Sequence, residues 1–421
     1  MATMAIGLSG GILSTSTLAV IGSGSTLLLL PIPPQWLQIG YSPQYTYLLG
    51  DARTGQVIAE LPLWSVSFDR RLKVAGSFRG SLTLGDPRIT NTGWLTALDE
   101  GRTKIWVDRD GQLLWDGIAW TSGYSSETRV LDIGGSETWS YLTHRFVHDS
   151  LAFTQVDQLA IVRDLLAYAQ GRPLAYATGA PLTFPQPGGD VNIAIAGEMS
   201  GVLRNLSINW WDYQAIDDVI SKLAALDNGF DYSVDAAYAT GQPRSMLNLS
   251  YPRRGTPAQR SGLVFAYGES VIDYVWRRDG TQRAFTNTAL GQGSGEKMLH
   301  STASVTSWID NGFPALERVS SHKDIDDPAR LAAIATSEAA AFAKPIDLVT
   351  LIVNPLRDPP LGSFTVGDDV RLQITDERFP NPGLGGLNQS LDIYMRITGY
   401  QVTPSDSGPE RVEVSLGATL V

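Results

Sequence analysis

The stretch of residues 367–417 constrains the fold most, because its apolar and polar residues alternate. The alternating apolar positions are Val370, Leu372 and Ile374, followed after a Gly/Pro/Asn-rich break by Ile393, Met395 and Ile397. Strict period-two alternation is typical of a half-buried β-strand. Breaks of that composition between such runs indicate turns, so the stretch predicts an array of antiparallel hairpins rather than a helix.

A second segment, residues 117–135, resembles the end of this stretch. When Gly399 is placed on Gly117, identical residue types coincide at Thr403 and Thr121, Ser407 and Ser125, Arg411 and Arg129, Val412 and Val130, and Gly417 and Gly135. We interpret the two segments as copies of one strand–turn–strand unit, with chance similarity as the alternative. A duplication would place two related β domains in one chain.

Length and composition favour a chain of several β-rich domains. A single core stops growing at about 250–300 residues, whereas this chain has 421 residues. Charged residues make up 18%, below the usual ~25%, while 42 Gly, 23 Pro and 11 Trp indicate many turns and large aromatic surfaces. Such a composition also suits surfaces that are buried in an assembly.

The charge balance argues against stable nucleic-acid binding. The chain has 32 basic and 43 acidic residues, a net charge of −11, and binding to phosphate backbones depends on Lys and Arg. The pairs Arg253–Arg254 and Arg277–Arg278 are isolated, and we expect them on solvated strand ends. The absence of Cys excludes disulfides, thiolate catalysis and cysteine metal ligands.

Residues 1–36 form a separate N-terminal arm without a charged side chain. A secretory signal would need a basic start, but the first Arg is Arg53. A membrane-spanning helix needs about 20 predominantly apolar residues, and this run is interrupted by Ser, Thr and Gly and closed by prolines. We expect an arm that becomes ordered against a neighbouring subunit, with simple disorder as the alternative.

The remaining chain divides into a first β-barrel domain at 37–145, an inserted α+β domain at 146–285 and a second β-barrel domain with one helix at 286–421. In the first, Asp110-Gly111 between apolar runs predicts a hairpin. In the second, a capping box of Thr154 and Asp157 opens a helix, and another helix is expected at 213–226. In the third, Asp327 followed by Pro328 predicts a helix start.

The order of these parts resembles the tail-hub (baseplate hub) proteins of long-tailed bacteriophages, particularly minor tail proteins of siphophages that infect actinobacteria. The resemblance covers roughly residues 40–421 and lies in arrangement more than in a diagnostic motif. The segments that carry it are 224–232, 247–252, 263–268, 291–295, the helix after Asp327, and 366–372.

The resemblance implies a mainly β fold in which two related small antiparallel barrels flank an inserted α/β domain. It also implies a homotrimer whose six barrels form a pseudo-sixfold ring in the virion tail tip, assembled in the host cytoplasm. The implied partners are a distal tail protein ring, the end of the tape measure protein, and tail tip or fibre proteins. DNA would pass through the lumen without stable binding, and we expect acidic residues to line it. The arm of residues 1–36 has no counterpart in the resemblance.

The sequence evidence for catalytic or metal-binding residues is weak, so we expect no enzymatic activity, cofactor or metal. Ser9 lies in a nucleophile-elbow pattern, but without the strand–helix context that the pattern requires. His144 and His148 are four residues apart without the glutamate of a zinc helix. Residues 291–295 lack the spacing of a phosphate-binding loop, and we expect a flexible loop between strands there.

The acidic clusters have structural interpretations. Asp324, Asp326 and Asp327 fit helix capping. Asp368 and Asp369 fit a turn in which they accept backbone hydrogen bonds, and Asp108 and Asp110 lack the other ligands of a calcium loop. The glycosylation patterns are at Asn205, Asn248 and Asn388.

Tryptophan offers one alternative function. Trp210 and Trp211, or Trp115 and Trp120, could form a sugar-binding platform on a β scaffold. We expect them instead in domain cores and subunit seams, where large aromatics dominate burial. A structural tail hub is therefore the leading hypothesis, with a carbohydrate-binding β protein and a cell-wall hydrolase as alternatives.

Overall fold

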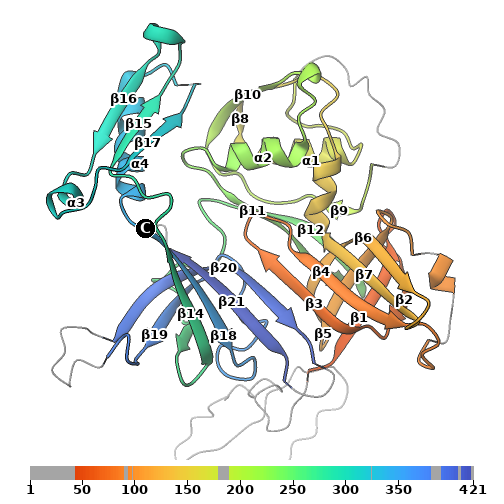
Figure 1. Cartoon of the computed structure of the whole chain (residues 1–421). Coiled ribbons are helices and arrows are strands. Elements are labelled where there is room, and N and C mark those ends of the chain that lie inside the picture. The colour runs from red at the N-terminus through yellow and green to blue at the C-terminus, as the bar shows by residue number, and fades with distance from the viewer. Residues whose placement is uncertain are drawn as a thin grey trace, which may run out of the picture.

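The computed structural model describes residues 43–89, 93–96, 98–178, 189–323, 325–380, 390–405 and 409–418. The arm of residues 1–36, with Ser9, lies outside the described residues, as do Asp324 and Asn388. The described chain has four parts, which we call the first β unit, the insert, the side lobe and the second β unit. Figure 1 shows the two β units side by side, with the insert and the side lobe above them.

The first β unit contains seven strands that follow one another in the chain. They are β1 (Tyr45–Asp51), β2 (Val57–Leu61), β3 (Trp64–Arg71), β4 (Ser77–Thr83), β5 (Thr103–Arg109), β6 (Gln112–Ser125) and β7 (Val130–Glu137). Their spatial order is β3-β4-β7-β6-β5-β1-β2. The 3₁₀ helices η2 (Gly93–Thr96) and η3 (Thr138–His144) lie between β4 and β5 and after β7.

The predicted hairpin between β5 and β6 is confirmed. Arg109 pairs with Gln112, so Asp110 and Gly111 form a two-residue turn. Both turn residues have positive φ, 54° and 85°, as a type I′ hairpin turn requires. The Asp108 carboxylate accepts a hydrogen bond from the Gly111 amide at 2.8 Å, so these acids are turn residues, as expected.

The second β unit is assembled from two separate stretches of the chain. Its strands are β13 (Val264–Ala266), β14 (Val271–Asp279), β18 (Ile346–Val353), β19 (Asp369–Ile374), β20 (Leu391–Thr403) and β21 (Arg411–Ala418). β13 and β14 lie in the segment that the sequence assigned to the inserted domain, but they pair with β19 and β18. Residues 364–366 form a buried connection outside the strands, in which Phe364 and Val366 enter the core.

The two β units share one sheet, so the expectation of two separate closed barrels is wrong for the described strands. Strand β20 pairs with β3 as well as with β19 and β21, which joins the units into a 13-stranded sheet. That sheet ends at β14, at β2 and, on a branch through β19, at β13, each with a single partner among the described strands. The apolar residues of both units also form one continuous core, which includes Phe68, Trp115, Leu351 and Val414.

The two hairpins predicted to be copies are both present, but the sequence alignment misplaces their residues. β6 pairs with β7 and β20 with β21, and each hairpin has one irregularity in its register, between Ala119 and Thr121 and between Ile397 and Gly399. Superposing the irregularities aligns Thr121 with Gly399, whereas the sequence alignment placed Gly117 there. The structural likeness therefore lies in hairpin geometry and not in the matched residue types.

The insert packs two helices against short strands. It comprises β8 (Leu151–Asp157), α1 (Gln158–Ala169), β9 (Ile193–Ala194), β10 (Leu203–Ile208), η4 (Trp210–Asp212), α2 (Ile216–Ala224), β11 (Asp231–Ala239) and β12 (Gln242–Ser250). The predicted capping box at Thr154 is wrong, because β8 continues through Thr154 and pairs with β10 up to Asp157. Asp157 itself caps α1 by accepting a hydrogen bond from the Leu159 amide at 2.9 Å.

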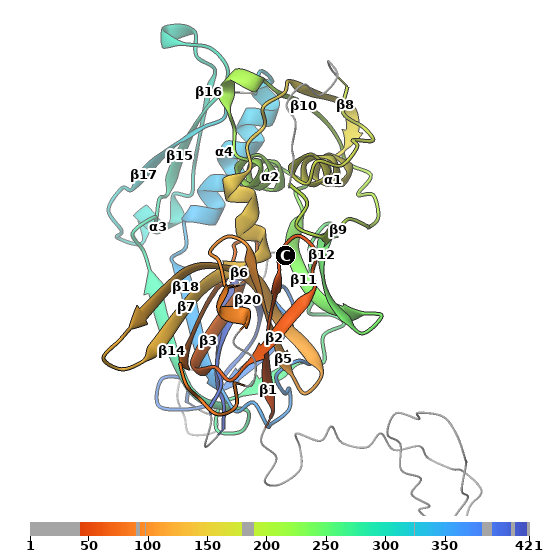
Figure 2. The same cartoon turned by 90° about the vertical axis from the view of Figure 1, so that its right-hand side faces the viewer.

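The side lobe interrupts the second β unit between β14 and β18. It contains β15 (Thr286–Leu290), η5 (Gly295–Lys297), β16 (His300–Ser304), α3 (Ser307–Asp310), β17 (Glu317–Ser321) and α4 (Pro328–Phe342). The buried side of α4 consists of Leu331, Ala335 and Ala339, one helical turn apart. Small side chains let this helix lie close to the lobe's three-stranded sheet, as Figure 2 shows from the side.

The predicted start of α4 is confirmed and can be tested. The Asp327 carboxylate accepts a hydrogen bond from the Ala329 amide at 2.9 Å, and Pro328 occupies the first turn. We expect Asp327→Ala to destabilise α4 by about 1 kcal/mol, measured as faster native-state hydrogen exchange of the α4 amides. The neighbouring Asp326→Ala is the control and should leave exchange unchanged; equal acceleration in both variants would contradict the cap.

Candidate functional site

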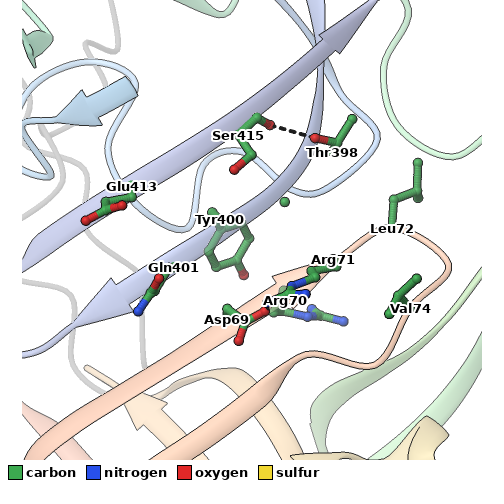
Figure 3. Close-up of a pocket in the computed structure, with 11 residues that line it drawn as sticks. Asp69, Arg70, Arg71, Leu72, Val74, Thr398, Tyr400, Gln401, Glu413 and Ser415 are labelled. Carbon is green, nitrogen blue, oxygen red and sulfur yellow. Dashed lines mark hydrogen bonds and ion pairs between the residues drawn. The ribbon is translucent and has the colours of Figure 1, made fainter. Parts of the chain in front are cut away.

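The candidate site is the seam where the two β units meet, between β3 and β20. Tyr400 pairs with Arg70 and Gln401 with Asp69 across this seam. Figure 3 shows the residues around a hollow of about 360 Å³ that spans β3, β20 and β21. Because residues alternate along a strand, one side of the seam faces the core and the other remains open.

The open side is polar and crosses the seam without a break. We call it the open face and define it by alternate residues of six neighbouring strands: Ser67, Asp69 and Arg71 of β3, Ser77, Arg79 and Ser81 of β4, Asp132 and Gly134 of β7, Thr121 and Gly123 of β6, Gln401 of β20, and Arg411, Glu413 and Ser415 of β21. All of them are polar or glycine, and Ser67 and Asp69 are the buried members of the set, at 5% and 7% exposure. A second hollow of about 560 Å³ lies on this face over β4, β6 and β7.

Side-chain hydrogen bonds tie the open face together. The Gln401 amide donates to the Ser67 hydroxyl at 2.8 Å, directly across the seam. The Asp69 carboxylate accepts a hydrogen bond from the Ser77 backbone amide at 2.9 Å and forms an ion pair with Arg71 at 2.6 Å. Arg411 pairs with Glu413 at 2.8 Å. The acids of this face are thus engaged by neighbours on the same face.

The opposite side of the seam carries a buried ionic junction between three parts of the chain. Arg70 of the first β unit lies 2.9 Å from the Glu137 carboxylate and 2.7 Å from the Asp235 carboxylate of the insert. Arg254 reaches the same Asp235 carboxylate at 2.8 Å. Because Arg254 also donates to the Val366 carbonyl at 3.1 Å, the junction extends to the second β unit.

Electrostatics at the junction depend on burial and on these arginines. Burial alone would favour protonated Asp235, but Arg70 and Arg254 hold its pKa well below the usual range. Burial raises the pKa of Glu137 to about 7, although Arg70 and the Gly76 amide favour its charged form. Asp231 follows the pattern of Asp235: Arg396, the Arg254 amide and Lys73 lower its pKa against the effect of burial.

Two more buried ion pairs lie where the first β unit meets its neighbours. Lys104 lies 3.3 Å from Asp116, and Asp116 also accepts a hydrogen bond from Ser245 of β12 at 2.6 Å. Burial lowers the pKa of Lys104, which Asp116 opposes. Arg109 pairs with Glu410 of the second β unit at 2.6 Å. The parts are therefore held together by charges out of contact with solvent.

The arginine pair at 253–254 was expected on solvated strand ends, and for Arg254 this is wrong. Its residue exposure is 8%, because it inserts between the insert and the second β unit at the junction. Arg253 pairs with Asp369 at 2.5 Å. By contrast, Arg277 and Arg278 are exposed on β14. No sequence pattern distinguished the two pairs, since burial here depends on strands that are distant in the chain.

The histidine and acidic candidates form no metal site. The ring of His144 lies 4.6 Å from Trp120 and that of His148 lies 5.7 Å from Tyr213, so they contact different aromatics. Within the described ranges, no group of three or more His, Asp or Glu is arranged to hold a metal ion.

The other turn and loop candidates have structural roles. Asp368 accepts hydrogen bonds from the backbone amides of Thr256 at 2.7 Å and Thr365 at 2.8 Å, as expected. Residues 291–295 connect β15 to η5 and β16. Two asparagines of the glycosylation patterns form side-chain hydrogen bonds: Asn205 accepts one from the Gln155 backbone amide, and Asn248 donates one to the Asp235 carboxylate.

The tryptophans divide between core and surface. Trp115 lies in the shared core, as expected, and the Trp120 indole donates to the Ser140 hydroxyl at 2.8 Å. Trp210 and Trp211 are exposed, with ring planes 84° apart. A flat sugar-binding platform requires coplanar rings, so this pair does not form one.

Comparisons with known proteins concern the fold. No family model matches the sequence, and no curated protein matches it. The crystal structure of a tail protein from Neisseria meningitidis MC58 matches with a TM-score of 0.57 and 14% identity, over 90% of this chain and 97% of that chain. The 43 kDa tail protein of prophage MuSo2 from Shewanella oneidensis matches with a TM-score of 0.55 and 13% identity, over 89% and 98%.

This chain has the fold of these tail proteins. At such low identity the likeness concerns the fold alone, and it extends over nearly the whole length of both structures. The tail-protein fold is consistent with the mainly β architecture expected from the sequence. No helix among the described residues is both long and apolar enough to cross a membrane.

The shared carboxylate of Asp235 gives a testable prediction. Asp235→Asn leaves Arg70 and Arg254 without their common counter-charge, and breaking a fully buried pair costs about 3–5 kcal/mol. Because the Asp235 side chain keeps 23% exposure, we expect a loss of about 2–3 kcal/mol in urea unfolding. The control is Asp392→Asn, which breaks an exposed pair with Arg371 and should cost less than about 1 kcal/mol. Equal losses would contradict the junction.

Acid should weaken the same junction. A carboxylate with a depressed folded pKa contributes stability above its unfolded pKa, near 4, and this contribution is lost as pH falls. We therefore expect the wild type to lose more stability than Asp235→Asn between about pH 4 and pH 2, measured by urea unfolding. The raised pKa of Glu137 acts in a separate window, since it lowers stability as pH rises from 4.5 towards about 7. Parallel curves below pH 4 would contradict the role of Asp235.

Proposed function

We propose that this chain is a structural virion protein, a trimeric tail hub that joins the tail tube to the tail tip. The observation that carries the proposal is the fold, shared over nearly its whole length with two tail proteins. Supporting it, the chain contains two β units joined edge to edge through β3 and β20. Three copies would supply six such units around one axis.

The open face is the proposed wall of the channel through which DNA leaves. It is continuous across both units and made of small polar and charged side chains, which suits a surface that DNA must pass without sticking. Its acids are Asp69, Asp132 and Glu413, and its bases are Arg71, Arg79 and Arg411. The expectation of an acidic wall is not met on this face, because the two signs are present in equal number.

Paired charges can serve the same purpose as an acidic wall. Binding to DNA gains free energy when Lys or Arg replaces counterions on phosphates. Arg71 and Arg411 are already paired with Asp69 and Glu413, so phosphate would have to compete with a carboxylate. The proposed partners are those of a tail hub: a distal tail protein ring, the end of the tape measure protein, and tip or fibre proteins.

The proposal is non-enzymatic and predicts a defined assembly. We expect light scattering of the purified chain to give three times the mass of the 45.5 kDa chain, and negative-stain images of the same peak to show a threefold ring with a central hole. A compact monomer that binds glycan beads would contradict the hub and support a carbohydrate-binding protein.

A further inference from the structure

Among the described residues, the 13-stranded sheet ends at three strands: β2, β13 and β14. As far as the described part of the chain goes, strand β2 pairs only with β1, while strand β14 pairs with β18 and has one further bridge, from Val271 to Tyr267. Edge strands present unpaired N–H and C=O groups, and proteins normally cover or blunt them. Figure 1 shows β14 within the left-hand unit and β2 at the right-hand side of the lower half, so the two ends do not meet within one copy.

The β14 end exposes apolar side chains between charged ones, which include Asp273, Arg277 and Asp279. Ile272 is 60% exposed, and Ile346 and Leu348 of the adjoining β18 are each 48% exposed. The register pairs Val275 with Thr350 and Arg277 with Leu348. These residues therefore share one side of the two strands, opposite to the side on which Trp276 and Val349 pack into the core.

The β2 end has a smaller surface of matching character. Val57 and Ile58 are 37% and 39% exposed, and Glu60 is exposed two residues further along the same strand. The register of β2 against β1 is irregular at Ile58, which has no partner between Val57 and Ala59, and Val57, Ile58 and Glu60 are all exposed. Strand β2 thus exposes an apolar residue and an acid, Ile58 and Glu60. Strand β14 exposes an apolar residue and a base, Val275 and Arg277.

The charges at the two ends are complementary and unused. In the described part of the chain, neither Arg277 nor Glu60 has an ion pair or side-chain hydrogen bond, although both are exposed. The neighbouring Arg278, by contrast, pairs with Asp347 at 2.9 Å. A free base on one apolar edge and a free acid on the other are the elements of a specific contact.

We propose that these two ends bind each other between copies: the β14–β18 edge of one copy packs on the β2 edge of the next. Val275, Ile346 and Leu348 would cover Val57 and Ile58, and Arg277 would pair with Glu60. The contact joins two different surfaces, so it is heterologous and generates a ring if the rotation closes. This inference rests on the proposed trimer, and it resembles the contact that β20 and β3 already make within the chain.

Charge reversal tests the contact. Arg277→Glu and Glu60→Arg each place like charges together, and we expect each to raise the protein concentration at which half the trimer dissociates by at least about tenfold, or about 1.4 kcal/mol. The double variant restores opposite charges and should return the trimer to near wild-type stability. Glu296→Arg and Arg330→Glu reverse exposed charges on the side lobe and should change nothing. Unchanged thermal unfolding of the monomer checks that each variant folds.

Cysteine crosslinking gives an independent readout, because the chain has no native Cys. A variant with both Val275→Cys and Ile58→Cys should form dimers and trimers on non-reducing gels, and neither single variant should crosslink. Crosslinking of the single variant Val275→Cys would show that β14 of one copy contacts β14 of another copy, which overturns the proposal. A trimer that persists in both charge-reversal variants would overturn the proposed contact but not the proposed hub function. A wild-type protein that is monomeric at every concentration would refute the hub function itself.

Discussion

Two arginines share one carboxylate where the parts of this chain meet, and the architecture depends on that arrangement. Arg70 comes from the first β unit, Arg254 follows the insert, and Asp235 lies in the insert. Without Asp235, Arg254 would lose its ion-pair partner and Arg70 would keep only Glu137, and an uncompensated charge in a protein interior costs several kcal/mol. The junction thereby fixes how the insert sits on the seam between β3 and β20, and with it which side of the seam stays open.

The strands and helix starts were the most predictable features. Alternation at Val370, Leu372 and Ile374 identified β19 because one side of that strand is buried. Asp110-Gly111 identified a hairpin, and Asp327 with Pro328 identified the start of α4, because these signals act within a few residues. The capping box at Thr154 failed for a related reason: pairing of β8 with β10 prolonged the strand to Asp157, and long-range pairing overrides a local capping preference.

The candidate site was much less predictable, because distant segments form it. The burial of Arg254 results from strands on three parts of the chain, and no property of the dipeptide at 253–254 predicts this burial. The parallel pairing of β13 with β19 joins residues about a hundred positions apart in the sequence. Likewise, the expectation of two separate barrels could not anticipate that β20 would pair with β3, since edge-to-edge joining leaves no local signature. The open face is a consequence of that pairing.

The central claim is that the open face lines a channel at the axis of a threefold ring. Cryo-electron microscopy of the purified assembly tests it directly, because individual strands can be placed in a map at side-chain resolution. We predict three copies around a central hole, with Arg71, Gln401 and Glu413 facing the hole. A ring in which these residues face outward, or are buried beneath another subunit, would contradict the account.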